Sequence, residues 1–106
     1  MVIMIDLDGT LCVEGNKLDR PLAKPFPGAV EALNKILIDG HIVVIWTGRG
    51  WDEYKMTEKW LKDNGFKYTQ LLMGKPVANL IIDDRSRHFE GWDKDYLATI
   101  HDRHRR

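Results

Sequence analysis

The chain has 106 residues, and its 16 lysine and arginine side chains balance its 16 aspartate and glutamate side chains, so the formal net charge is zero. This length predicts one domain, and the neutral balance argues against nucleic acid or an anionic membrane surface as a partner. The longest apolar run, Ile42–Trp46, is too short to cross a bilayer.

The N-terminus and the cysteine content bear on localisation. The sequence begins Met-Val-Ile-Met-Ile-Asp, without the basic start and cleavage site of a signal peptide. Cys12 is the single cysteine, so an internal disulfide cannot form, which fits a reducing compartment. We therefore expect a cytoplasmic protein.

The predicted elements alternate between strand and helix. Apolar runs mark the strands, and apolar residues at helical spacing mark the helices. In chain order they are a strand at 2–7, a proline-containing loop at 11–27, a helix at 28–39, a strand at 42–47, a helix at 51–64, strands at 68–73 and 79–83, and a helix at 92–102. This order predicts an α/β domain, three-layered and Rossmann-like, with a parallel sheet of about four to five strands and helices on both faces.

Polar residues stand where the predicted strands end. Asp6 and Asp8 close the first strand, Thr47 closes the second, Lys75 follows the third, and Asp83–Asp84 close the fourth. Sheets of this kind bind ligands at the carboxyl ends of their strands. We therefore expect these side chains to converge on one edge, from separate places in the chain.

The run from Asp6 to Thr10 carries most of the chemistry. Side chains two apart in a strand point to the same side, so Asp6 and Asp8 crowd one small volume unless a cation joins them. Mg²⁺, a hard ion that prefers oxygen ligands, is the natural cation. Gly9 has no side chain, so its backbone N–H can approach an anion closely.

The later strand ends add groups that suit a phosphate. Thr47 offers a hydroxyl, Gly48 offers an accessible N–H, and Lys75 is a point-charge phosphate binder that Pro76 holds extended. Asp83–Asp84 supply a further carboxylate for the metal. Each motif also has a purely structural explanation: a turn for the first, a strand terminus for Thr47, a surface lysine for Lys75 and a helix cap for Asp83–Asp84. All four explanations would have to be true at once for the chain to have no such site.

These motifs, in this order, resemble those of the haloacid dehalogenase superfamily. The matching residues are Asp6–Thr10, Thr47, Lys75–Pro76 and Asp83–Asp84, and the resemblance covers roughly residues 1–90. It implies a Mg²⁺-dependent phosphatase. The stretch Leu72–Asp84 and the small size also resemble a branch linked to capsule or surface-sugar biosynthesis, which implies a small phosphorylated metabolite such as a sugar phosphate as substrate.

The resemblance also implies individual roles. Asp6 would attack phosphorus and carry an aspartyl-phosphate, and Asp8 would protonate the leaving alcohol and then activate water. The backbone carbonyl of Asp8 would bind Mg²⁺ with the carboxylates of Asp6 and Asp83, and Asp84 would support the metal. Thr47 and Lys75 would hold and neutralise the phosphoryl oxygens. The accessible N–H groups of Gly9 and Gly48 suit the same oxygens.

Other residues keep two readings each. Arg49 touches the substrate or braces its loop, and Trp51 walls the pocket or packs at a helix entry. Met56 and Trp60 lie four apart on one helix face, where they serve core packing or a subunit contact. The second reading favours a homo-oligomer.

The motif spacing leaves no room for a cap domain over the site. Residues 11–27 separate the first motif from the first helix, and a helix and a strand fill most of the span between Thr47 and Lys75. We therefore expect an open site, which accepts large substrates or borrows walls from another subunit. Two alternatives stay open: a polynucleotide or protein phosphatase that uses this open site, and a non-catalytic phospho-accepting regulatory module.

Overall fold

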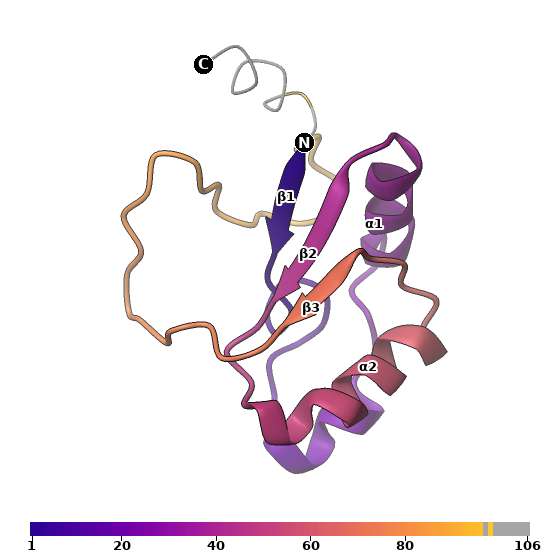
Figure 1. The fold of residues 1–106 in the computed structure, drawn as a ribbon, viewed down its shortest axis with the longest axis vertical. Coiled ribbons are helices and arrows are strands. Elements are labelled where there is room, and N and C mark those ends of the chain that lie inside the picture. The colour runs from indigo at the N-terminus through magenta and orange to yellow at the C-terminus, as the bar shows by residue number, and fades with distance from the viewer. Residues whose placement is uncertain (97, 99–106) are drawn as a thin grey trace.

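Three parallel strands form the sheet of the computed structural model, which describes residues 1–96 and 98 (Figure 1). Within these residues the strand order is β1 (Val2–Ile5), β2 (Ile42–Trp46) and β3 (Gln70–Leu72). Each strand lies inside its predicted range. Ile5, the last residue of β1, pairs with Ile45, the residue before the last of β2, so the two strands end at the same edge of the sheet.

Two helices connect the strands. α1 (Ala29–Ile38) joins β1 to β2, and α2 (Tyr54–Asp63) joins β2 to β3. Both agree with the predicted helices within a few residues, although the first turn of the second one is the separate 3-10 helix η2 (Trp51–Glu53). A further 3-10 helix, η1 (Lys17–Leu22), lies in the predicted loop at 11–27. In the described residues no helix is long and apolar enough to span a membrane.

Both helices pack on the same face of the sheet. Side chains of α1 and α2 share one buried cluster with alternate residues of the strands: Ile5, Leu33, Ile36, Val43, Ile45, Trp60, Leu61 and Leu71. The expectation of helices on both faces is therefore wrong for the described part of the chain. The reason is geometric, because two successive right-handed crossovers in the same direction put their helices on one side.

The opposite face of the sheet is less covered at β1. Val2 and Met4 point there, and they are 62% and 51% exposed. Val44, the partner of Met4 in β2, is buried. The first strand thus has one side in the core and one side facing solvent.

The predicted fourth strand is absent from the described residues, so the sheet is smaller than the expected four to five strands. Residues 79–83 run in the long loop after β3, apart from β1 in Figure 1. Leu80 and Ile82 are 75% and 91% exposed. An apolar strand is stable when it pairs and buries one face, and this segment does neither here.

The described residues test only part of the last predicted helix, 92–102. Residues 92–96 form turns and bends, Ala98 is helical, and Trp92 packs against Phe89 with ring centroids 5.2 Å apart. Residues 97 and 99–102 of this prediction lie outside the described residues.

Candidate functional site

Asp6 and Asp8 flank a fully buried leucine directly after β1. Leu7 is 0% exposed, and its carbonyl accepts the backbone N–H groups of Thr10 and Leu11 at 3.1 and 2.8 Å. Gly9 takes a φ of +83°, which a side chain would disfavour, and so allows the sharp turn. The turn fixes both carboxylates at the carboxyl edge of the sheet, as the sequence predicts.

The carboxylate of Asp8 is held by Arg49. Nε of Arg49 donates to Oδ2 of Asp8 at 2.9 Å, and Nη2 donates to Oδ1 at 2.7 Å. Nη1 donates to Oγ1 of Thr57 at 3.0 Å. The Arg49 side chain is 1% exposed, so it braces the Asp8 carboxylate from inside the protein. Of the two readings of Arg49, this geometry matches the brace.

The loop after β2 is joined to the loop after β3. The carbonyl of Thr47 accepts the N–H of Lys75 at 2.8 Å, and the carbonyl of Arg49 accepts the N–H of Gly74 at 2.9 Å. A Cβ on Gly48 would lie 3.3 Å from Cγ2 of Val77, so a glycine fits this close approach. These backbone bonds bring the second and third motifs together.

Lys75 reaches the first motif from this loop. Its Nζ lies 3.8 Å from Oδ1 of Asp6 and 5.3 Å from the centre of the Trp46 ring. The structure therefore brings together the carboxylates of Asp6 and Asp8, the end of β2 at Thr47, and the ammonium of Lys75. Thr47 itself is buried, and its hydroxyl accepts the Arg49 N–H at 3.2 Å.

Burial raises the pKa of Asp6 above its ordinary value of 3.8, and the nearby charges of Asp8 and Glu14 raise it further. Lys75 and the backbone N–H of Leu7 lower this pKa but do not cancel the rise. A partly buried carboxylate beside two other acidic groups is stabilised by a cation. Asp6 and the carbonyl of Asp8 offer oxygen donors of the kind that Mg²⁺ prefers.

The acidic pair Asp83–Asp84 is not brought to this place. Both residues are exposed on the loop after β3, and Oδ1 of Asp83 accepts the N–H of Arg85 at 3.0 Å. That bond lowers the pKa of Asp83. Among residues 1–96 and 98, no three histidine, cysteine or acidic side chains form a cluster that could hold a metal ion. The proposed third carboxylate of the metal site therefore stands apart from Asp6 in this conformation.

Trp51 lies at the rim of the site. Its ring is 63% exposed and stacks on Tyr54, with centroids 5.7 Å apart. A Cβ on Gly74 would lie 3.7 Å from Nε1 of Trp51, which places the indole beside the loop that carries Lys75. The exposed Trp51 therefore borders the loop that carries Lys75.

Sequence reasoning missed the anchor Thr57, whereas Trp60 matches the core-packing reading, one of the two that the sequence left open. Thr57 is 0% exposed on the inward face of α2, and its signal was a polar residue among apolar ones at helical spacing. Trp60 is 4% exposed, stacks on Phe66 and donates from Nε1 to the carbonyl of Ala23 at 2.8 Å. It packs in the core, so Met56 and Trp60 do not form the exposed patch that motivated a homo-oligomer.

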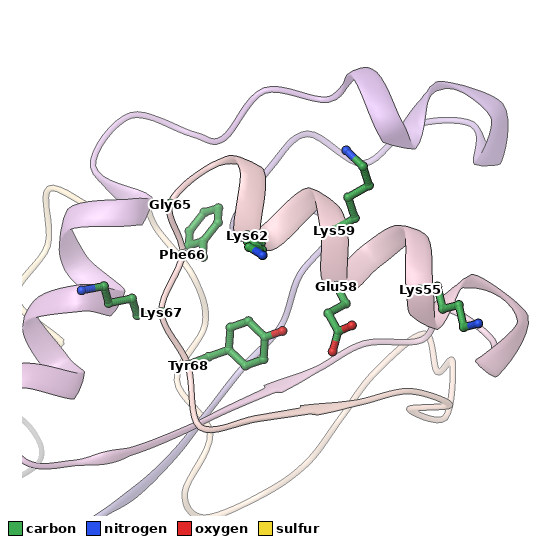
Figure 2. Close-up of a pocket in the computed structure, with 8 residues that line it drawn as sticks. All are labelled: Lys55, Glu58, Lys59, Lys62, Gly65, Phe66, Lys67 and Tyr68. Atoms are coloured by element: carbon green, nitrogen blue, oxygen red, sulfur yellow. The ribbon is translucent and has the colours of Figure 1, made fainter.

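A pocket lies on the flank of α2, away from the residues of the candidate site (Figure 2). It has a volume of about 760 Å³ and includes four lysines, Lys55, Lys59, Lys62 and Lys67. None of the site residues lines it. The carboxylates of the candidate site therefore sit at an open edge of the sheet and not in this pocket.

Comparison with known proteins supports the fold. No family profile and no curated protein matches the sequence. The structure is similar to a crystal structure of a structural-genomics target from Vibrio cholerae, with a TM-score of 0.75 and 25% identity over 95% of this chain and 94% of that one.

Two further similar structures carry functional names. One is the Pnkp1/Rnl/Hen1 complex, with a TM-score of 0.61 and 24% identity over 78% of this chain and 30% of that one. The other is D,D-heptose 1,7-bisphosphate phosphatase from B. bronchiseptica, complexed with magnesium and phosphate, with a TM-score of 0.52 and 17% identity over 80% of this chain and 53% of that one. At these identities the likeness to the two structures shows the fold alone.

Proposed function

We propose that the protein is a Mg²⁺-dependent phosphomonoesterase that acts through an aspartyl-phosphate on Asp6. The observation that carries this proposal is the pair of carboxylates at the end of β1, with Arg49 bound to Asp8 and Lys75 3.8 Å from Asp6. The name of one structure with this fold, a heptose bisphosphate phosphatase complexed with magnesium and phosphate, points the same way.

The reaction has two steps. A carboxylate oxygen of Asp6 attacks phosphorus, the bond between phosphorus and the ester oxygen breaks, and its electron pair leaves on that oxygen, which takes a proton from Asp8. Water then attacks the phosphorus of the aspartyl-phosphate and gives a proton to Asp8, which releases phosphate and regenerates Asp6. Lys75 and the backbone N–H groups of Gly9 and Gly48 hold the phosphoryl oxygens, with Thr47 at the same strand end.

Mg²⁺ fits the oxygen donors of this edge. The carboxylate of Asp6 and the carbonyl of Asp8 would hold it together with Asp83, and Asp84 would support it. When bound, the ion supplies positive charge that offsets the charge of the phosphoryl group. Because Asp83 stands apart here, its part in the site requires residues 79–83 to move beside β1.

The proposed substrate is a small phosphorylated metabolite, such as a sugar phosphate. The exposed ring of Trp51 beside the Lys75 loop is a surface on which a sugar can stack. The likeness to a heptose bisphosphate phosphatase and the sequence resemblance to the capsule-linked branch support the same class.

We propose a cytoplasmic enzyme with no nucleic acid or membrane partner. A homo-oligomer, which would supply walls to the open site, stays a proposal that light scattering tests.

A screen of phosphorylated metabolites with Mg²⁺ tests this function, with the Asp6→Asn variant as the background control. Sugar phosphates should exceed nucleotides, phosphopeptides and phosphorylated DNA ends by at least about tenfold in kcat/KM, a difference of about 1.4 kcal/mol in transition-state binding. If DNA or RNA ends lead, a polynucleotide phosphatase is the better assignment. Absence of phosphate release from every ester, or release that survives full removal of Mg²⁺, contradicts the proposal.

A further inference from the structure

We propose that Arg49 is a positioning residue that orients the Asp8 carboxylate for proton transfer, and that Thr57 fixes Arg49 in turn. This inference rests on the proposed phosphatase function. It assigns to two buried residues, one on the loop after β2 and one on α2, a role in the protonation of the leaving group.

The geometry favours positioning over any direct contact with substrate. Arg49 meets Asp8 through two parallel hydrogen bonds of 2.9 and 2.7 Å, an arrangement that fixes the plane of the carboxylate as well as its place. The Arg49 side chain is 1% exposed and the Asp8 side chain 15% exposed, so the guanidinium lies behind the carboxylate as seen from solvent. A phosphate at the sheet edge therefore meets Asp8 and not Arg49.

Thr57 completes the device. Its hydroxyl accepts a hydrogen bond of 3.0 Å from Nη1, the guanidinium nitrogen that does not contact Asp8. Thr57 is 0% exposed on α2, a helix whose inward side chains Trp60 and Leu61 are held in the core. The helix therefore sets the position of the guanidinium, and the guanidinium sets the plane of Asp8.

This arrangement matters for the proton. Each carboxylate oxygen has two lone pairs, and one on each oxygen of Asp8 accepts from Arg49. The thiol of Cys12 also donates to Oδ1 at 3.9 Å. The second lone pair of Oδ2 therefore remains for the proton that Asp8 gives to the leaving oxygen and later takes from water. Proton transfer needs hydrogen-bond geometry, so a carboxylate that rotates freely should lose much of the benefit of general acid catalysis.

The leaving group provides a readout that a merely structural role would not move. 4-Nitrophenolate leaves easily without a proton, whereas the alkoxide of benzyl phosphate needs one. The experiment measures the first-turnover release of each alcohol by rapid quench, with the full-length protein and Mg²⁺. The variants are Arg49→Lys and Thr57→Val, and the matched control is Thr69→Val, which removes another hydroxyl that accepts one hydrogen bond, at 3.0 Å from the N–H of Val43.

Arg49→Lys should slow the first turnover of benzyl phosphate by about a hundredfold, the lower end of the range for general acid catalysis, and that of 4-nitrophenyl phosphate by less than about threefold. Thr57→Val should show the same pattern at about tenfold, and Thr69→Val should change neither rate. If Arg49→Lys fails to fold, the Thr57→Val pattern decides.

Equal slowing of both substrates, or an increase in KM with kcat unchanged, overturns the inference while the phosphatase function stands. A wild-type protein that releases neither alcohol overturns the proposed function, and the inference falls with it. The two failures are therefore distinguishable.

Discussion

Nζ of Lys75 lies 3.8 Å from a carboxylate oxygen of Asp6, although the two residues belong to the first and third motifs of the chain. The contact exists because the Lys75 N–H donates to the carbonyl of Thr47, which ties the loop after β3 to the loop after β2. Positive charge is thereby placed beside the proposed nucleophile before any substrate arrives, which is the preorganisation that phosphoryl transfer needs.

Replacing Lys75 should weaken catalysis for every phosphate ester. Lys75→Ala removes the charge next to Asp6, and we expect kcat/KM to fall by about 10² to 10³, the usual loss for one preorganised electrostatic group. Lys59→Ala is the matched control, because Lys59 is an exposed lysine on the flank of α2 that pairs with Asp63 at 2.6 Å. Steady-state assays on 4-nitrophenyl phosphate check this; equal losses in both variants contradict a specific role.

Substitution of the two carboxylates of the first motif, Asp6 and Asp8, should affect turnover to different extents, because their proposed roles differ. Asp6→Asn should abolish turnover because an amide cannot form the phospho-enzyme, and Asp8→Asn should slow it by several orders of magnitude, because an amide cannot carry the proton. Both proteins should keep their fold, since neither carboxylate belongs to the buried apolar cluster. Asp8→Asn should be the less stable of the two, because it removes the charged partner of the buried Arg49. Acid-quench detection of phospho-enzyme, with circular dichroism as the check of folding, tests this. Phospho-enzyme in the Asp6 variant contradicts the assignment.

Asp6 should also make stability depend on pH in the absence of metal. The folded pKa of Asp6 is raised above 3.8, so the folded state binds its proton more tightly than the unfolded state does. The penalty for the carboxylate is therefore absent below pH 3.8 and grows as pH rises through the raised pKa. The free energy of unfolding of the wild type, minus that of Asp6→Asn, should fall over this window and then level off. Urea titrations of both proteins across this pH range measure it, and a difference that does not change with pH contradicts the raised pKa of Asp6.

The sequence was informative where local pattern and burial agree. The apolar run of β2 and the helical spacing of α1 predicted these elements within a residue or two, because both bury their apolar side chains in the core. Asp6 and Asp8 were placed correctly at the end of β1 for the same reason. The Arg49–Asp8 pair was not predictable, because it depends on how a loop approaches another strand end, which no local pattern encodes.

The fourth strand shows the opposite limit. Residues 79–82 carry the apolar pattern of a strand, yet Leu80 and Ile82 are exposed. An apolar sequence pattern predicts that a segment forms a strand once it pairs with a neighbour. Whether it pairs depends on the edge of another strand, which lies far away in the sequence. The same gap explains why Asp83–Asp84 were expected at the site and are found apart from it.

Cys12 should be inert in the folded protein. Its side chain is fully buried, and burial, with the charge of Asp8 next, raises the pKa of the thiol to about 11. Only the thiolate reacts, so at pH 8 roughly one molecule in a thousand carries the reactive form. Iodoacetamide should leave the native protein unlabelled and label it rapidly in urea. Rapid labelling of the native protein, or loss of activity in Cys12→Ala without loss of fold, contradicts a passive packing role.

Mg²⁺ should bring residues 79–83 to the edge of β1. Among the described residues β1 pairs only with β2, and the exposed apolar side chains of residues 80–82 could cover the face on which Val2 and Met4 are exposed. Burying three such side chains is worth about 5–9 kcal/mol, and ordering five residues costs about 5–10 kcal/mol, so the balance is close to zero. A metal ion that binds Asp6 and Asp83 together would shift this equilibrium toward the state in which residues 79–83 lie beside β1.

Hydrogen exchange measures this transition directly. Amides of residues 79–83 should exchange quickly without metal and become protected when Mg²⁺ and inorganic phosphate are added, whereas amides of α1 should not change. Asp83→Asn should lose the added protection, because it removes the carboxylate that links the segment to the ion, and Asp39→Asn should keep it. Identical exchange of residues 79–83 with and without Mg²⁺ would show that the acidic pair does not join the site, and Asp6 would then need another metal ligand.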